Sequence, residues 1–244
     1  MMQIYYATHK PKVKKTNQDV LLVGKKIISN VVFQKPKTIE LNENAIIAIA
    51  DGASSHKYSQ IIGIKLMRSL RNLTNFTSSS IQKHLVYMQE HFSFEASFKS
   101  HLYGAVSTLS VCLLSDKSIE VFHVGDTRVY KIENGLQELT IDHTQAMRML
   151  HSGEITKEAY KNRSSIYNVL ENYFVYGENE DFFIDYSKFI WKQGDRFLVC
   201  SDGLWKKLDE GFVYQNGSLE VIANKLFALM QTSDDDASFI VVEV

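Results

Sequence analysis

The amino-acid sequence predicts an α+β protein in which antiparallel sheets are packed between layers of helices. Short strand-like runs, separate segments with helical periodicity and the order of the two support this prediction. The strand-like runs are rich in β-branched and aromatic residues and cover 19–24, 44–50, 106–114, 119–124, 128–132, 195–200 and 237–244. A parallel sheet requires regular alternation of strand and helix, which this order lacks.

The middle strands are expected to form successive antiparallel hairpins. The turn at 115–118 joins the first pair in this prediction, and the turn at 125–127 joins the next pair. Asn134 and Gly135 form a dipeptide that is typical of a type I′ turn. Together these turns predict a meander.

Three segments have apolar residues at helical spacing. Their apolar faces are formed by Ile62, Leu66, Leu70 and Leu73, by Ile81, Leu85, Met88 and Phe92, and by Leu219, Ile222, Leu226 and Leu229. Each face needs a partner to cover it, so the helices are expected on the outside of the sheets.

Composition predicts one compact domain over residues 1–244. The 244 residues include only two prolines and no linker-like or repetitive tract. The 27 Lys and Arg nearly balance the 28 Asp and Glu, which argues against a nucleic-acid partner. The start of the chain lacks an apolar signal core, and no apolar run approaches the roughly 18 residues of a membrane span. We therefore expect a soluble, cytoplasmic protein with no membrane partner.

Five aspartates lie at strand ends or beside glycine turns, namely Asp19, Asp51, Asp126, Asp202 and Asp235. Asp51 and Asp202 each end an apolar run and precede a glycine, which permits a tight turn and leaves a carbonyl available as a ligand. Each one alone is explained equally well by a turn or a solvated loop. Together, oxygen ligands without a His or Cys partner favour Mg²⁺ or Mn²⁺ and two-metal hydrolysis.

Six sequence segments, taken together in their order along the chain, form a pattern that is more specific than any one of them. They are KKTNQDVLLV, IAIADGASSHKYSQ, GAVSTLSVCLL, FHVGDTRVYKIENGLQELTIDHT, DRFLVCSDGLW and DDDASFIVVEV. In this order they resemble the motifs of the metal-dependent serine/threonine protein phosphatases, the PPM or type 2C family, and in size the chain is similar to its bacterial single-domain members. The resemblance implies a four-layer αββα sandwich of two antiparallel sheets flanked by helices.

The resemblance also implies roles for the aspartates around two Mn²⁺ or Mg²⁺ ions. Asp51 would bridge both ions and Gly52 would offer its carbonyl. Asp202 and Asp235 would hold the second ion, and Asp19 would act through bound water. Asp126 would help Asp202 to hold a third ion. A water activated by the ions would then attack the phosphorus.

Three departures from the family pattern bear on the site. Lys14 stands where the family has the arginine that clamps the substrate phosphate, and lysine keeps the charge but lacks the bidentate fork. The alternative for Lys14 is a solvated basic run with its lysine neighbours. Ser54 and Ser55 replace paired glycines, and Asp236 replaces an asparagine and adds negative charge.

Two histidines match family positions and are candidate general acids. We predict that His56, together with Lys14, is a catalytic residue. A structural hydrogen-bonding role is the alternative for both His56 and His143. Cys200 is expected to be a buried thiol rather than a nucleophile.

The segment 142–183 corresponds to the family's variable flap, where substrate choice is expected. Its tyrosines, Tyr160, Tyr167, Tyr173 and Tyr176, are either packing residues or a partner surface.

The leading functional hypothesis is a monomeric phosphatase that acts on phosphoserine and phosphothreonine in proteins, with a serine/threonine kinase or its targets as partners. One alternative is a phosphatase-like module that binds phosphoproteins without turnover, motivated by Lys14, Ser54 and Ser55. Another is a metal-dependent hydrolase of small phosphate esters.

Overall fold

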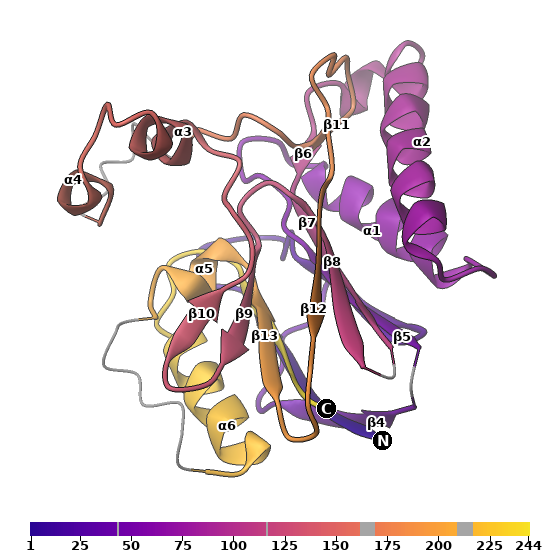
Figure 1. Ribbon diagram of the computed structural model, residues 1–244. Coiled ribbons are helices and arrows are strands. Elements are labelled where there is room, and N and C mark those ends of the chain that lie inside the picture. The colour runs from indigo at the N-terminus through magenta and orange to yellow at the C-terminus, as the bar shows by residue number, and fades with distance from the viewer. Residues whose placement is uncertain (43, 116, 162–168, 209–216) are drawn as a thin grey trace.

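The structure, a computed structural model, describes residues 1–244 except 43, 116, 162–168 and 209–216 (Figure 1). Two six-stranded sheets pack face to face, and every strand pair in them is antiparallel. Helices cover both outer faces, which confirms the predicted four-layer αββα sandwich. Tyr167 of the predicted flap lies outside the described residues.

Sheet I contains both ends of the chain and has the strand order β10-β9-β13-β14-β1-β4. Its strands are β1 (Met2–His9), β4 (Lys37–Leu41), β9 (Arg128–Ile132), β10 (Leu136–Glu138), β13 (Arg196–Cys200) and β14 (Ala237–Glu243). The first and last strands are neighbours in this sheet, with Gln3 opposite Glu243, so the termini lie close together (Figure 1).

Sheet II has the order β12-β8-β7-β5-β2-β3. Its strands are β2 (Val20–Val23), β3 (Lys26–Ile28), β5 (Ala45–Ala50), β7 (Leu109–Leu114), β8 (Ser118–Val124) and β12 (Asp185–Ile190). A separate two-stranded sheet pairs β6 (Val106–Ser107) with β11 (Phe174–Val175).

The helices lie on the outside of the sheets, as predicted, and divide between them. α1 (Ser59–Arg71) and α2 (Ser78–Ala96) pack on sheet II, and α5 (Asp202–Trp205) and α6 (Leu219–Met230) pack on sheet I. A 3₁₀ turn covers Ser100–Leu102. α3 (Gln145–His151) and α4 (Lys157–Lys161) project away from the sandwich (Figure 1).

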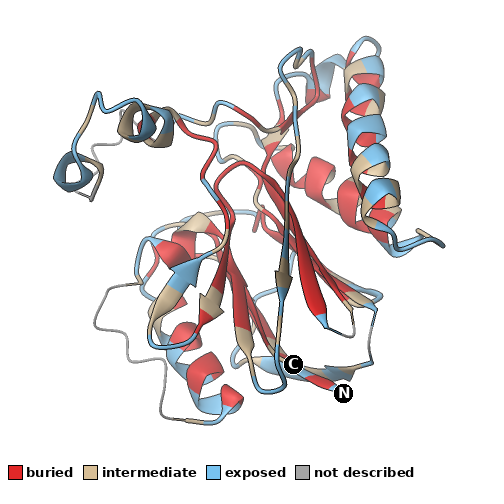
Figure 2. Ribbon diagram, viewed as in Figure 1, coloured by how far each residue is buried: buried red, intermediate tan, exposed pale blue. Residues whose placement is uncertain are grey.

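Three apolar layers hold the sandwich together, one between the sheets and one beneath each helix layer (Figure 2). Ile47 and Ile240 belong to the layer between the sheets, whereas Ala48 packs toward α1 and Val241 toward α6. Central strands are therefore covered on both faces, which explains why their sequences are continuously apolar. Cys200 is buried and free in the same core, as predicted.

The predicted meander is wrong at the turn 125–127. β8 lies in sheet II and β9 lies in sheet I, so this turn crosses between the sheets instead of closing a hairpin. Gly125 has a φ of +101°, and a Cβ added there would lie 2.5 Å from Cγ2 of Thr108. The crossing therefore needs a glycine for both its backbone conformation and its close packing.

The connection between β9 and β10 also differs from the prediction. The strands do form a hairpin, with Leu136 opposite Ile132, but three residues join them and neither Asn134 nor Gly135 has a positive φ. A type I′ turn needs two central residues with positive φ, so that prediction is wrong.

Among the residues that the structure describes, no helix combines the length and the apolar character that a bilayer crossing requires.

Candidate active site

Two of the predicted metal ligands, Asp19 and Asp51, lie together at one end of sheet II. Val20 is opposite Ala50 in the antiparallel register of β2 and β5. Asp19 directly precedes Val20 and Asp51 directly follows Ala50, so both carboxylates leave the sheet at the same end. The side chain of Asp19 is fully buried.

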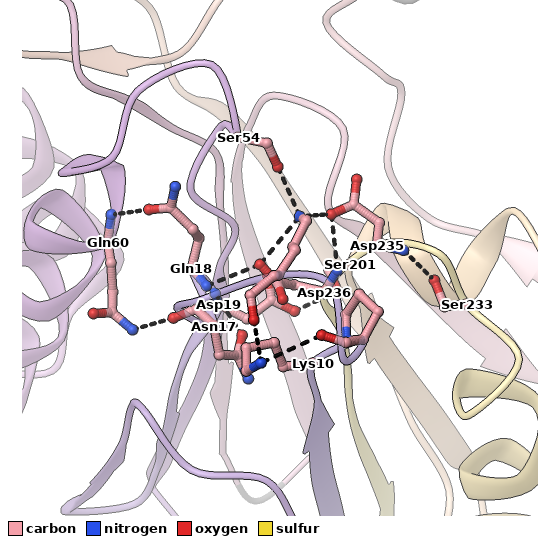
Figure 3. Close-up of polar contacts among 12 residues, drawn as sticks. Lys10, Asn17, Gln18, Asp19, Ser54, Gln60, Ser201, Ser233, Asp235 and Asp236 are labelled. Atoms are coloured by element: carbon pink, nitrogen blue, oxygen red, sulfur yellow. Dashed lines mark hydrogen bonds and ion pairs between the residues drawn. The ribbon is translucent and has the colours of Figure 1, made fainter.

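The other three aspartates reach the same end of the molecule from sheet I or from its border. β13 pairs with β14 so that Cys200 is opposite Phe239, and Asp202 and Asp235 lie just beyond this pair. Asp126 lies in the turn that crosses between the sheets. The two groups meet directly, because the hydroxyl of Ser201 donates a hydrogen bond of 2.8 Å to Oδ2 of Asp19 (Figure 3).

The aspartates oppose one another's ionisation. Burial, followed by the charges of Asp19 and Asp202, raises the pKa of Asp51 well above its usual value. Burial and the charge of Asp236 raise the pKa of Asp19 to about 7. Burial and the charge of Asp202 raise the pKa of Asp126 to about 8. A positive charge placed among these groups would relieve this repulsion.

Two lysines already neutralise part of the cluster. Lys14 Nζ forms an ion pair with Oδ1 of Asp235 and also lies 3.2 Å from Oδ2 of Asp236. Lys206 Nζ lies 2.5 Å from Oδ2 of Asp202. The role of Lys206 was not predicted, although its position four residues after a helix-initiating aspartate is a signal for such a pair.

Asp236 is more buried than its neighbour Asp235, with 2% of its surface exposed. Its Oδ2 accepts a hydrogen bond of 3.0 Å from the backbone N–H of Gln18 as well as the contact with Lys14. The additional negative charge predicted from the sequence is therefore present inside the site.

A network of amides fixes the loop before β2 against the start of α1 (Figure 3). The side-chain carbonyl of Gln18 accepts the N–H of Gln60 at 2.9 Å, and the side-chain amide of Gln18 donates to the carbonyl of His56 at 3.0 Å. Oδ1 of Asn17 accepts the N–H of Asp19 at 3.0 Å. A Cβ added to Gly52 would lie 3.0 Å from the backbone N of Gln60, so the glycine allows α1 to approach the site closely.

The Asp126 turn is held from both sides. The indole N–H of Trp205 donates to the Asp126 carbonyl at 2.8 Å. The guanidinium of Arg128 stacks 3.7 Å from the Trp205 ring centroid and binds both oxygens of Asp142. His143 accepts the N–H of Gly125 at its Nδ1, with a distance of 3.1 Å.

The two candidate histidines differ in their surroundings. His143 is buried, and its Nε2 lies 3.0 Å from Asp185, which indicates a hydrogen-bonding role that holds the Asp126 turn. His56 is only partly buried, its Nδ1 accepts the N–H of Tyr58 at 3.3 Å and its ring lies against the Tyr58 ring. Proton donation by His56 would therefore use Nε2.

The ligand atoms fit a hard divalent cation. Within the described ranges no three His, Cys, Asp or Glu side chains form a ready-made metal site, and Asp235 and Asp202 are paired with lysines instead. The donors are nevertheless carboxylate and carbonyl oxygens, which Mg²⁺ and Mn²⁺ prefer. Oδ1 of Asp19 and Oδ1 of Asp236 are buried and have no hydrogen-bond partner among the described residues, so a cation would satisfy them.

Comparison with known families explains the arrangement. The sequence profile described as protein phosphatase 2C matches residues 35–237. The chain belongs to the protein phosphatase 2C family. This membership confirms the resemblance drawn from the six sequence motifs.

Named relatives of this protein phosphatase 2C member are bacterial enzymes. The serine/threonine phosphatase stp of Listeria innocua is 25% identical over 179 residues, which are 69% of this chain and 70% of that protein. The serine/threonine protein phosphatase PstP of Mycobacterium tuberculosis is 22% identical over 213 residues, which are 82% of this chain and 40% of that protein. The family match and these relatives confirm the predicted protein serine/threonine phosphatase.

Solved structures share the fold. Serine/threonine phosphatase Stp1 from Staphylococcus aureus superposes with a TM-score of 0.83 at 18% identity, covering 100% of this chain and 95% of that one. The catalytic domain of PstP, in a crystal structure with 2 manganese ions, superposes with a TM-score of 0.74 at 18% identity, covering 100% and 99% of the two chains.

Proposed function

We propose that this protein phosphatase 2C member removes phosphate from phosphoserine and phosphothreonine in proteins with the help of two Mn²⁺ or Mg²⁺ ions, and of a third ion at Asp126. The observation that supports the proposal is the convergence of carboxylates from both sheets at one end of the sandwich, where burial and then their mutual charges raise the pKa of Asp51 and Asp126. The proposed ligands are Asp19, Asp51, Gly52, Asp126, Asp202 and Asp235.

Bound ions would supply Lewis acidity, which activates water and neutralises charge on the phosphoryl oxygens. Asp51 would help to hold the ions, because burial and then the charges of Asp19 and Asp202 raise its pKa and a cation there would relieve that repulsion. The carbonyl of Gly52 adds an uncharged oxygen ligand. The hydroxyl of Ser201 holds Oδ2 of Asp19 and leaves Oδ1 available.

Cationic side chains at the rim are placed to bind an anionic substrate. Lys14 is the proposed phosphate-binding residue, because its ammonium group lies at the carboxylate cluster and its side chain is 21% exposed. His56 is the proposed general acid for the leaving oxygen through its Nε2. The role of Lys14 rests on its contacts with Asp235 and Asp236 and on the family motif, and the role of His56 rests on the family motif.

The proposal extends to the setting of the enzyme. We treat residues 1–244 as a single phosphatase domain that acts as a monomer in the cytoplasm on the targets of a serine/threonine kinase, or on the kinase itself. The segment 142–183 is the proposed flap, and the projection of α3 and α4 from the sandwich supports its role in substrate choice (Figure 1).

The test is hydrolysis of a phosphothreonine peptide with Mn²⁺ and with EDTA. Asp202→Asn should lower the Mn²⁺-dependent rate about a hundredfold or more, because it removes a charge that binds and polarises the ions. Asp234→Asn is the matched control in the neighbouring acidic run, because its side chain is fully exposed, and it should leave the rate unchanged.

Each opposite result has a distinct meaning. Activity that persists in EDTA and in Asp202→Asn would contradict the proposal. Phosphopeptide binding without turnover would favour the non-catalytic binding module, and turnover restricted to small phosphate esters would favour the metabolite hydrolase.

A further inference from the structure

The ammonium group of Lys14 has its three hydrogens committed to acceptors within the protein. Its partners are Oδ1 of Asp235, Oδ2 of Asp236 at 3.2 Å and Oγ of Ser54 at 2.7 Å. A lysine ammonium has three donors, so none is left for a phosphate in this arrangement. The group that should clamp the substrate is therefore bound to the carboxylates.

The buried charge of Asp236 explains why Lys14 is held there. Asp236 is almost completely buried, and Lys14 is the cation in contact with its Oδ2. A buried carboxylate without a cation is costly. The chain departs from the family motifs at both of these positions together, with lysine for arginine and aspartate for asparagine, so that the added anion and the altered cation contact each other.

The backbone of Lys14 is fixed while its side chain can change partners. The Lys14 N–H donates to the carbonyl of Pro11 at 3.1 Å, and Lys10 donates through its Nζ to the carbonyl of Lys14. Lysine has a flexible four-carbon stem and a compact charge, unlike the planar fork of arginine. The ammonium group can therefore reach different acceptors from one backbone position.

We propose that Lys14 and Asp236 form a counter-ion pair that competes with the second metal ion for Asp235, and that binding of this ion releases the Lys14 ammonium for the substrate phosphate. The inference rests on the proposed function, since it regulates that same site. Two positive groups cannot share the Asp235 carboxylate without repulsion. By linkage, the lysine weakens metal binding by the same factor by which the metal weakens the lysine contact.

The first measurement is Mn²⁺ affinity by isothermal titration calorimetry. Lys14→Met should bind Mn²⁺ more tightly than the wild type, by about tenfold, because the internal competitor is removed. Lys15→Met is the matched control: it removes the same charge from an exposed neighbour in the same basic run and should leave the affinity unchanged.

A second background separates the pair from its parts and guards against misfolding of Lys14→Met. In Asp236→Asn the anion that retains Lys14 is absent, so adding Lys14→Met should tighten Mn²⁺ binding by a smaller factor than it does in the wild type. In the double variant Asp236 is replaced by a neutral residue, so the loss of Lys14 leaves no unpaired buried carboxylate.

The second measurement is the reactivity of the Lys14 amine toward an amine-modifying ester, read by mass spectrometry. Mn²⁺ should increase modification of Lys14 in the wild type, and Asp236→Asn should increase it without metal. Lys15 in the same peptide region serves as the internal reference.

The possible results distinguish this inference from the proposed function. If the wild type binds Mn²⁺ but Lys14→Met binds it no more tightly and Lys14 labelling does not respond to Mn²⁺, the inference is wrong and the phosphatase proposal stands. If the wild type binds neither Mn²⁺ nor Mg²⁺ in calorimetry, both are wrong.

Discussion

The two halves of the site solve the problem of clustered negative charge in different ways. On sheet II, Asp19 is fully buried and is held by a hydroxyl and a backbone contact, with no lysine against it among the described residues. On sheet I, Asp202 and Asp235 are partly exposed and each is paired with a lysine. The carboxylate of Asp19 on sheet II thus has no lysine against it among the described residues, whereas Asp202 and Asp235 on sheet I each have one. Substitutions at the contacts between the two sheets therefore test this difference.

The largest effect is expected where the chain crosses from one sheet to the other. Gly125→Ala should lower the free energy of unfolding by about 2–4 kcal/mol, because alanine is strained at a φ of +101° and its Cβ would clash with Thr108. Urea unfolding measures the change. Gly135→Ala is the control, because a Cβ there meets nothing within 4 Å, and it should change stability by less than about 0.5 kcal/mol. Equal losses for the two variants would contradict the role of the crossing.

A pH-dependent effect is expected at His123, which links β8 to the segment after β10. His123 is buried, its Nδ1 lies 2.9 Å from Ser110 Oγ and its Nε2 lies 3.1 Å from the carbonyl of Ile141. Burial, followed by the charge of His143, lowers the pKa of His123 to about 4. Between pH 6.5 and 4 the unfolded chain therefore binds the extra proton and the folded chain does not, so stability falls as the pH falls.

This loss should amount to about 2–3 kcal/mol between pH 6.5 and 4, and His123→Gln should remove it. Urea unfolding at several pH values, compared with the exposed control His151→Gln, isolates the contribution of His123 from that of the carboxylates. Parallel profiles of stability against pH for the wild type and His123→Gln would show that His123 does not cause the loss of stability.

The smallest effect is expected at the hydrogen bond between the halves. Ser201→Ala removes the donor to Asp19 Oδ2 and the acceptor of the Ser238 N–H, and it should cost about 1–2 kcal/mol of stability. Ser97→Ala, at an exposed helix end with one local hydrogen bond, should cost less than about 0.5 kcal/mol. A Ser201 variant as stable as the Ser97 variant would argue against coupling of the halves through this contact.

Sequence patterns predicted most of the strands that are buried on both faces, but not β1, in which exposed Gln3 and half-buried Tyr5 alternate with buried residues. β5 and β7 are continuously apolar because sheet and helix layers cover both sides, and they end where the aspartates begin. β12 was not predicted, because alternate residues along this edge strand are half-exposed and its sequence lacks an apolar run. The end of a fully buried strand can therefore be predicted from the sequence alone, because the apolar run stops there.

Two features of the site depend on packing between distant segments and could not be predicted. The turn at 125–127 has the same local sequence signal whether it closes a hairpin or crosses between sheets. The packing of Gly125 on Thr108 distinguishes the two arrangements, and this packing joins residues that are distant in the sequence. The contact between Lys14 and Asp235 joins residues 221 positions apart. The sequence identified each residue as a candidate, but it contained no signal that they pair with each other.

The origin of the aspartates in both sheets has a consequence for how the molecule is assembled. A divalent cation at the proposed ligands, Asp51 after β5 of sheet II and Asp235 before β14 of sheet I, would link the two sheets without a covalent bond. Its binding free energy would add to the folding free energy, by about 2.7 kcal/mol at a cation concentration one hundred times the dissociation constant. The two sheets would then be held together most firmly when the proposed ions are bound, and chelation would lower the stability of the whole sandwich rather than that of the site alone.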